Sequence, residues 1–315
     1  MKKQTLIPLI ILAVILAASL FNSKTTPSPR SDIVIGAVLS QTGFASAFGE
    51  HAQNAMTLAA EEINNAGGIH GRKVVIKTED DKSSGKDAVT SFQKLAEIDQ
   101  VDGIIGGVFD FIAQPLFPLA EQKKLTFISP TNFYIKGVLE PGNQSFVLYP
   151  PLETVIAELR GYYTLQSKEV QNAIIHYQSD FGKEITRTLQ DIMNTQGKVL
   201  IEESYTTIGT GDFKTQIIKL KQQNVDTVFL DMLDMDIISF KKQADTLGFK
   251  AKIITYTTFK DVMASTKDLG VYEGTTMINW EVATKGFDEQ YQKRFGKLPE
   301  RGAVNSYKAV YVLAD

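Results

Sequence analysis

The sequence predicts an α/β protein with two lobes, each built on a parallel β-sheet that helices cover on both faces. Short apolar runs alternate with amphipathic helical patterns from Ile33 onward, and the alternation starts again after the segment Val147–Glu153. Such alternation is typical of βαβ units, whose strands are buried on both faces. The chain has 315 residues, which suits two domains at about 150 residues each.

Each series supplies predicted strands that end where a helical pattern begins. The strands of the first series are Ile33–Leu39, Lys73–Glu79, Asp102–Gly107 and Leu125–Pro130, and those of the second are Asn172–Tyr177, Lys198–Ser204, Asp226–Asp231 and Ala251–Tyr256. The predicted helices are Glu50–Gly68, Gly85–Ile98, Thr154–Leu165, Gly182–Thr195, Phe213–Gln223 and Ile237–Leu247. Ligands of parallel sheets gather at the carboxyl ends of the strands. We therefore expect binding residues in the loops Ser40–Gly49, Val108–Phe111, Thr131–Ile135, Gln178–Phe181, Asp231–Asp236 and Tyr256–Phe259.

The first 21 residues are typical of an export signal peptide or an N-terminal membrane anchor. Lys2 and Lys3 precede an apolar run that ends at Phe21, as in secretory signals. Ala17 and Ser19 offer a small-residue cleavage point, whereas an uncleaved run would anchor the protein. Residues 22–32 form a linker rich in Ser, Thr and Pro. Both readings predict an extracytoplasmic location, in the periplasm or at the cell surface.

The composition excludes several classes of function. The chain has no cysteine, which rules out disulfides, thiolate metal sites and thiol catalysis. Its net charge of −3 does not favour nucleic acid or an anionic membrane surface as a partner. No nucleophile elbow, dinucleotide fingerprint or phosphate-binding loop occurs in the sequence. We therefore expect no cofactor, no metal and no catalytic residues. The histidines His51, His70 and His176 lie far apart, and His176 near a strand end is interpreted as a packed residue.

Two groups of acids lie where strands pass into helices. They are Asp80 with Asp81, and Asp231 with Asp234 and Asp236. Carboxylates so placed can hold a hard cation. They can also cap helices and favour their positive ends, and this is the interpretation that we prefer.

The order of motifs resembles one known family. The segment Ile33–Asp81 has a strand, a Thr-Gly turn, the pair Phe48-Gly49, a helix ending in A-x-x-E-I-N-x-A-G-G-I-x-G and a strand ending in Asp-Asp. "DFGKEI" and "DFKTQIIKLK" follow, and "YKAVYVLAD" ends the chain. Over about Ile33 to Asp315, this order is similar to the extracellular solute-binding proteins for branched-chain amino acids and related ligands, which have the type I periplasmic binding fold and serve ABC importers.

The resemblance implies two Rossmann-like lobes that close on a ligand about a hinge. Lobe one would comprise residues 33–149 and 279–315, and lobe two residues 150–278, with the hinge near Tyr149–Pro151 and Gly274–Trp280. The protein would capture an amino acid, an amide or a related compound and deliver it to an ABC permease. Family members normally continue past the late helix, so the C-terminal elements are expected to be truncated: either this sequence is a fragment, or lobe two is short of its closing elements.

The resemblance also places the ligand site, where this sequence departs from the family. In the family, a hydroxyl at the position of Asp110, backbone groups near Thr131 and a hydroxyl at the position of Phe133 hold the ligand carboxylate. An acid at about Thr257 pairs with the ligand ammonium, and an aromatic hydroxyl stands at Leu233. Here those positions carry other side chains. The expected ligand-binding residues are Phe48, Phe109, Asp110, Phe111, Thr131, Asn132, Phe133, Phe181, Leu233 and Thr257.

Asp110 argues against copying the family's ligand. Two like charges 4 Å apart repel by about 4 kcal/mol at an effective dielectric of 20, so a ligand carboxylate beside Asp110 is disfavoured. We expect a ligand that is neutral or cationic there, such as an amide, an aromatic compound or a small amine. The alternative is that Asp110 only caps its helix and the phenylalanines are core.

Three other functions stay open at this point. The same fold serves membrane-tethered ligand sensors, which an uncleaved N-terminal segment would favour. An enzyme would need a catalytic constellation, which the sequence does not supply. A degenerate protein that binds nothing would follow if the second lobe lacked essential elements.

Overall fold

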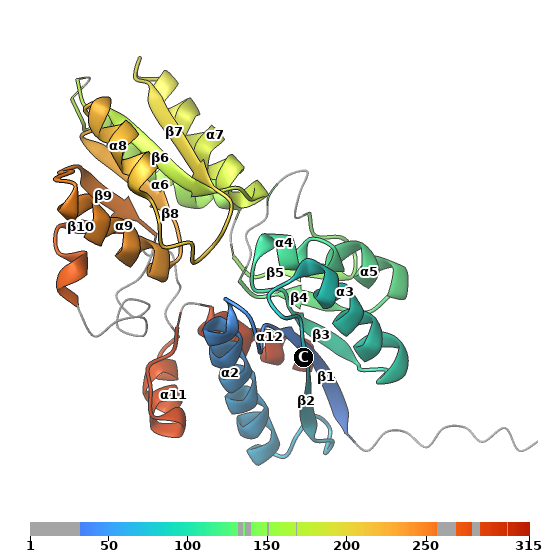
Figure 1. The fold of residues 1–315 in the computed structure, drawn as a ribbon. Coiled ribbons are helices and arrows are strands. Elements are labelled where there is room, and N and C mark those ends of the chain that lie inside the picture. The colour runs from blue at the N-terminus through green and yellow to red at the C-terminus, as the bar shows by residue number, and fades with distance from the viewer. Residues whose placement is uncertain are drawn as a thin grey trace, which may run out of the picture.

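The computed structural model describes residues 32–131, 135, 140–149, 151–167, 169–256, 269–278, 284–300 and 302–315. They form two parallel sheets of five strands each. The first sheet, ordered β2-β1-β3-β4-β5, contains β1 (Ile33–Leu39), β2 (Val74–Asp80), β3 (Gly103–Gly106), β4 (Phe127–Ser129) and β5 (Ser145–Val147). The second, ordered β10-β9-β8-β6-β7, contains β6 (Asn172–Tyr177), β7 (Leu200–Tyr205), β8 (Thr227–Asp231), β9 (Lys252–Thr255) and β10 (Thr275–Met277). Figure 1 shows each sheet in its own lobe, which we call lobe one and lobe two.

Helices cover both faces of each sheet. In lobe one these are α2 (Ser46–Asn65), α3 (Gly85–Gln93, continued by a π-helical turn to Ile98), α4 (Asp110–Ala113) and α5 (Leu116–Lys123). Lobe two has α6 (Leu152–Thr164), α7 (Asp180–Asn194), α8 (Lys214–Gln222) and α9 (Asp234–Thr246), with a 3-10 turn at Leu269–Tyr272. One apolar cluster contains residues of α3 and α5 in lobe one and of α6 and α7 in lobe two, and it includes Tyr149 and Leu152 at the crossing between the lobes. The opposite faces are covered by α2 in lobe one and by α8 and α9 in lobe two.

The end of the chain returns to lobe one. Helices α11 (Phe287–Phe295) and α12 (Ala303–Ala314) both pack on α2, as Figure 1 shows. Phe287 and Tyr291 of α11 share an apolar cluster with Leu58 of α2. His51 of α2 is buried there, and its Nδ1 lies 2.8 Å from the Tyr291 hydroxyl. These contacts complete the apolar layer over one face of the first sheet.

The predicted fold class is confirmed, and the predicted strands all form, with ends that differ by at most two residues. One strand, β5, was not predicted as such. It has three residues at the edge of a sheet, which is too short for an apolar run or an alternating pattern to stand out. The three residues of β10 lie within the segment 274–280, where a strand was expected at the second hinge crossing. The π-helical turn at Lys94–Ile98 was expected as ordinary helix.

The strand orders place one switch point in each lobe. In lobe one, β1 lies between β2 and β3, so the chain adds β2 on one side of β1 and then crosses to add β3 on the other side. In lobe two, β6 lies between β7 and β8 in the same way. In open parallel sheets, ligands bind outside the carboxyl ends of the strands at such points. The residues that follow β3, β6 and β8 are therefore positioned for a binding site.

A glycine at the end of β3 is required by close approach of the neighbouring strand. A Cβ added to Gly106 would collide with the carbonyl oxygen of Val38 in β1. We expect Gly106→Ala to lower the free energy of unfolding by about 1–3 kcal/mol, the range for overpacked interiors, measured by urea denaturation. Gly161→Ala is the matched control, because a Cβ there meets nothing within 4 Å, and it should raise stability by up to about 1 kcal/mol, as alanine does over glycine inside a helix. Equal effects of the two changes would contradict the packing account.

Candidate ligand site between the lobes

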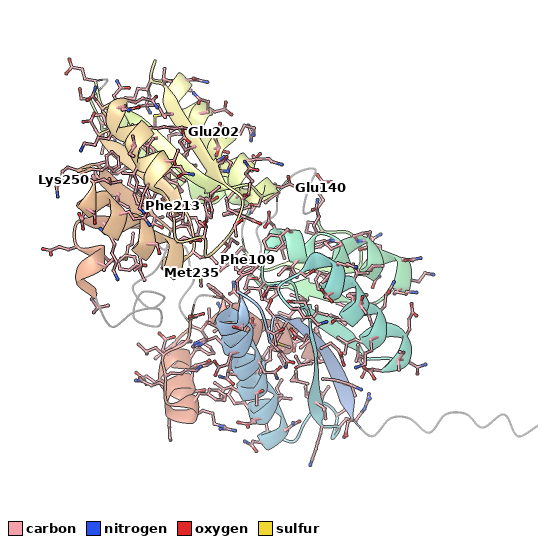
Figure 2. All side chains as sticks on the ribbon, viewed as in Figure 1. Phe109, Glu140, Glu202, Phe213, Met235 and Lys250 are labelled. Carbon is pink, nitrogen blue, oxygen red and sulfur yellow. The ribbon has the colours of Figure 1, made fainter. Side chains whose placement is uncertain are left out.

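A cavity of about 50 Å³ lies where the two switch points face each other. Its walls come from loops after β3 in lobe one and after β6, β8 and β9 in lobe two, with the end of β7. The lining residues are Phe109, Asp110, Phe111, Tyr177, Ser179, Phe181, Tyr205, Ile208, Asp231, Met232, Leu233 and Tyr256. Figure 2 labels Phe109 at the side of lobe one that faces lobe two. Ligand pockets commonly measure about 300–1,000 Å³, so this arrangement of the lobes accommodates only a small group.

The turn after β3 presents Phe109, Asp110 and Phe111 to this cavity. Gly107 has a φ of 73°, and a Cβ there would lie 2.6 Å from the Cβ of Ala113. Such a left-handed conformation favours glycine. The backbone then becomes extended at Phe109 and helical from Asp110, where α4 starts. The rings of Phe109 and Phe111 stack with centroids 5.7 Å apart, so the two phenylalanines form one apolar surface with the acid between them in sequence.

Asp110 bonds to the opposite lobe. Its Oδ2 accepts a hydrogen bond of 3.0 Å from the backbone N–H of Phe181, in the first turn of α7. The first N–H groups of a helix have no partner within the helix and carry its positive dipole end. Ser179 caps the same helix by accepting from the Gly182 N–H at 3.0 Å. A carboxylate of lobe one therefore supplies a second cap to a helix of lobe two, and a hydrogen bond to a charged group contributes about 1.5–3 kcal/mol.

Burial raises the pKa of Asp110, while the N–H groups of Phe181 and Phe111 offset part of that rise. The side chain is 8% exposed, and the nearby charge of Asp180 raises the pKa further. For an acid whose pKa is higher in the folded state than in the unfolded state, the folded state binds the proton more tightly. Stability then increases as the pH falls through the folded pKa.

Aromatic rings also connect the lobes beside this bond. The rings of Phe111 in lobe one and Tyr177 in lobe two have centroids 6.0 Å apart. Tyr177 in turn lies 5.6 Å from Tyr205. Ring pairs at such distances contribute about 0.5–1.5 kcal/mol beyond their burial. The contact between the lobes thus combines a polar bond with ring packing.

The wall from lobe two holds a second buried acid, Asp231, at the end of β8. Its side chain is 3% exposed, and Oδ1 accepts a hydrogen bond from the Tyr256 hydroxyl. A Cβ added to Gly182 would lie 2.8 Å from Asp231 Oδ2 and 2.9 Å from His176 Nδ1. The absence of a side chain at Gly182 thus lets Asp231 approach the first turn of α7.

His176 is a packed residue, as the sequence indicated. Its side chain is 3% exposed, Nδ1 lies 2.9 Å from the Tyr177 carbonyl oxygen and Nε2 lies 3.0 Å from Glu202 Oε1. Both neighbours are acceptors. The imidazole ring is therefore held in place by the Glu202 carboxyl group and the Tyr177 carbonyl oxygen.

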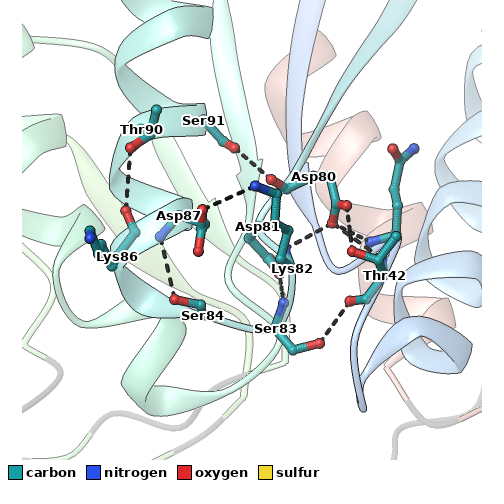
Figure 3. Close-up of polar contacts among 11 residues, drawn as sticks. Thr42, Asp80, Asp81, Lys82, Ser83, Ser84, Lys86, Asp87, Thr90 and Ser91 are labelled. Carbon is teal, nitrogen blue, oxygen red and sulfur yellow. Dashed lines mark hydrogen bonds and ion pairs between the residues drawn. The ribbon is translucent and has the colours of Figure 1, made fainter.

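Asp80 and Asp81 do not cap the helix that follows them, contrary to the preferred interpretation. Figure 3 shows that Asp80 bonds the turn after β1, because its Oδ1 accepts from the Thr42 N–H, and that the same oxygen accepts from the Lys82 N–H in the loop after β2. Asp81 Oδ1 accepts from the Ser40 hydroxyl at 2.6 Å and from the Ser83 N–H at 2.8 Å. The cap of α3 is Ser84 instead. These acids hold the loop after β1 against the loop after β2.

The acids of α9 likewise bond away from their own helix end. Asp236 Oδ2 accepts from the Gly209 N–H at 2.9 Å, and Asp234 Oδ1 accepts from the Tyr272 hydroxyl at 3.1 Å. The helix starts after Leu233 without a side-chain cap. In the described part of the chain, no group of three or more His, Asp or Glu side chains is arranged to hold a metal ion.

The structure brings together five of the ten residues that the sequence proposed for the site, namely Phe109, Asp110, Phe111, Phe181 and Leu233. Phe48 stands one ring away, with its centroid 5.6 Å from that of Phe109. Thr131 does not line the cavity. Its hydroxyl donates to the Val108 carbonyl at 2.8 Å. Asn132, Phe133 and Thr257 lie outside the described residues.

Asp110 differs from both sequence interpretations, because neither foresaw a bond to the other lobe. The cap-only alternative is incomplete, since the carboxylate interacts with the Phe111 N–H at the start of its own helix and also accepts a bond from α7 of the other lobe. Tyr177 and Tyr205 were not selected from the sequence. Asp231 and Tyr256 lie in loops that were expected to contain binding residues, but neither was named among the ten.

A family model described as "Periplasmic binding protein" matches residues 32–315. The Leu/Ile/Val-binding protein BraC3 of Rhizobium johnstonii is 25% identical over 292 residues, which cover 91% of this chain and 79% of that protein. The Leu/Ile/Val-binding protein of Escherichia coli is 25% identical over 224 residues, or 71% of this chain and 60% of that protein.

Solved structures share the fold at lower identity. The branched-chain amino acid transporter substrate-binding protein LivJ of Streptococcus pneumoniae, in complex with isoleucine, has a TM-score of 0.76 at 20% identity over 90% of this chain and 83% of that chain. A solute-binding protein of an ABC transporter from Rhodopseudomonas palustris, in complex with 3,4-dihydroxybenzoic acid, has a TM-score of 0.77 at 19% identity over 90% and 80%. The type I architecture of two parallel-sheet lobes is therefore shared with these proteins.

The charge of Asp110 should be measurable in thermal unfolding. The Asp110→Asn side chain can accept the same bond from Phe181 without a buried charge, so we expect the variant to unfold at the same or a higher temperature than the wild type at pH 7. The difference should shrink as the pH is lowered towards 4, because the wild-type Asp110 then takes up a proton. A difference that grows on acidification would contradict a raised pKa. Asp191→Asn, an exposed acid on α7, serves as the control.

Proposed function

The chain belongs to the periplasmic binding protein family, and we propose that it captures a small solute outside the cytoplasmic membrane and delivers it to an ABC permease. The observation that supports this most directly is the cavity at the facing switch points, which takes its walls from both lobes. A ligand there contacts both lobes at once. The family is one of binding proteins rather than enzymes, and the proposal involves no turnover.

The proposed mechanism is closure of the two lobes about a hinge. A ligand that touches both walls of the cavity binds the closed arrangement better than an open one, and this difference shifts the equilibrium. We propose lobe boundaries at residues 149/150 and 278/279. Tyr149 and Leu152 belong to the apolar cluster that is continuous between the lobes, so the first crossing is packed as well as covalently linked. The second crossing falls partly outside the described residues.

The proposed ligand is neutral or cationic where it meets Asp110. The N-terminus of α7 could attract an anion, but Asp110 already supplies a carboxyl group to the Phe181 N–H. A ligand carboxylate at this place would have to displace that group and would be repelled by it. The named relatives bind branched-chain amino acids, and one solved neighbour holds an aromatic acid. We propose that this chain takes an amide, an aromatic compound or an amine instead.

The cellular location rests on the N-terminal segment, which lies outside the described residues. We propose that residues 1–21 direct export and are either removed or kept as an anchor. Retention would favour a membrane-tethered binding or sensing protein. Among the helices that the structure describes, none is long and apolar enough to cross a membrane.

A solute screen tests the binding function. We expect at least one compound from a panel of amino acids, amides, amines and aromatic compounds to raise the unfolding temperature, because a ligand at 100 times its dissociation constant stabilises the folded state by about 2.7 kcal/mol. Calorimetry would then give the affinity. Phe111→Ala, which removes a ring from the cavity wall, should weaken binding of the same compound. The control is Ile218→Ala on the exposed side of α8. A panel in which no compound shifts unfolding would count against a solute-binding function.

Export can be tested with the full chain in a bacterial host. We expect the protein to be accessible to protease outside the cytoplasmic membrane, while a variant without residues 2–21 remains inside. The mass of the purified native protein then separates removal from retention of the segment. Protection of the full chain within the cytoplasm would contradict the proposed location.

A further inference from the structure

The carboxyl group of Asp110 is held by donors from both lobes, and most of them belong to the lobe opposite its own. Its Oδ2 accepts from the Phe181 N–H at 3.0 Å, and the Ser179 hydroxyl is a second donor from lobe two. The Phe111 N–H is a third donor, from lobe one. An acid of lobe one thus lies against the first turn of α7, where a helix presents free N–H groups and its positive dipole end.

Aromatic side chains pack beside this contact. The ring of Phe111 lies with its centroid 6.0 Å from that of Tyr177 in lobe two, and it stacks on Phe109 at 5.7 Å. Phe109, Phe111 and Phe181 all pack against the apolar cluster that contains residues of both lobes. Parting the lobes would return ring surface to water, which is unfavourable. The rings therefore act in the same direction as the hydrogen bonds of Asp110.

The contact is self-sufficient, because each of its interactions joins two groups of the chain. Burial of the acid opposes it, since desolvation is the largest influence on Asp110 and raises the pKa of that carboxyl. Such a cost is small when the buried group has its hydrogen bonds satisfied, and Asp110 has three donors. A hydrogen bond to a charged group shifts a two-state equilibrium by about tenfold or more. The balance favours lobes that stay together without a solute.

We propose that Asp110 is a tether, which holds the two lobes closed in the absence of any solute by capping α7 from the opposite lobe. The tethered protein admits only a small group, because the cavity measures about 50 Å³. A larger solute has to break the bond from Phe181 before it enters, so its apparent affinity is reduced by the small fraction of untethered molecules. This consequence for a solute rests on the proposed solute-binding function, whereas the tether itself does not.

The separation of the lobes can be measured with two spin labels. The chain has no cysteine, so Lys86→Cys in α3 and Asn194→Cys in α7 introduce one labelling position in each lobe. Both side chains are exposed. The protein is expressed from the full sequence, then unfolded in urea and refolded, which removes any solute carried over from the host. We expect one narrow distribution of distances between the labels, at the value of the closed arrangement.

Three variants of the labelled protein test the role of the acid. Asp110→Ala should lower the ratio of closed to open molecules by about tenfold or more, because it removes a hydrogen bond to a charged group. Asp110→Asn keeps an acceptor for the Phe181 N–H, and its ratio should be at least about threefold above that of Asp110→Ala. The control is Asp180→Ala, which removes an acid from the same turn of α7. Asp180 pairs with Lys183 of its own helix at 3.1 Å, so the ratio should change less than about twofold.

Amide hydrogen exchange gives a second measurement of the same bond. The Phe181 N–H should exchange about tenfold or more faster in Asp110→Ala than in the wild type, because exchange follows the fraction of open molecules. The comparison uses variants that unfold in urea with wild-type cooperativity. Wild-type lobes that are mainly open would overturn the proposal, and so would wild-type distances and exchange in Asp110→Ala. Neither measurement involves a solute, so a failed tether leaves the solute-binding proposal to the solute screen.

Discussion

The hydrogen bond from the Phe181 N–H to Asp110 Oδ2 determines how the two lobes face each other. It fixes the start of α4 in lobe one against the start of α7 in lobe two, and the ring contact between Phe111 and Tyr177 packs beside it. The cavity exists because these two contacts bring the loops after β3, β6 and β8 together. The same bond also limits the chemistry of the site, because it places a carboxyl group where a helix N-terminus would otherwise attract anions.

The rest of each lobe supports that contact. In a parallel sheet with helices on both faces, the carboxyl ends of neighbouring strands lie at the same edge. Residues that are distant in sequence therefore become neighbours there. In lobe one, Gly106 and Gly107 allow the turn to leave β3 closely packed on β1 and α4. In lobe two, Gly182 allows the carboxyl group of Asp231 to approach the first turn of α7. Small residues at these positions thus set the distance between the acids and the helix.

The architecture is common to the family, whereas the side chains of the site decide which ligand is bound. A fold of this kind accommodates unlike ligands, since the solved neighbours hold isoleucine in one case and 3,4-dihydroxybenzoic acid in another. Function on a shared fold is decided by the side chains of the site. In this chain those side chains are two acids within an aromatic wall. They are the reason for proposing a ligand other than those of the relatives.

The sequence by itself determined the parts that depend on local pattern. The alternation of strands and helices gave two parallel sheets, and the end of β3 was correctly expected to lead through Phe109, Asp110 and Phe111 into a helix at the cleft. Only the tertiary structure decided the partner of Asp110, because Phe181 is 71 positions away and their contact depends on the orientation of the lobes. It also decided that the carboxyl groups of Asp80 and Asp81 bond the loop after β1 rather than the first turn of α3. Periodicity specifies which face of an element is buried, whereas the partner of a polar group depends on which loops the packed sheets bring together.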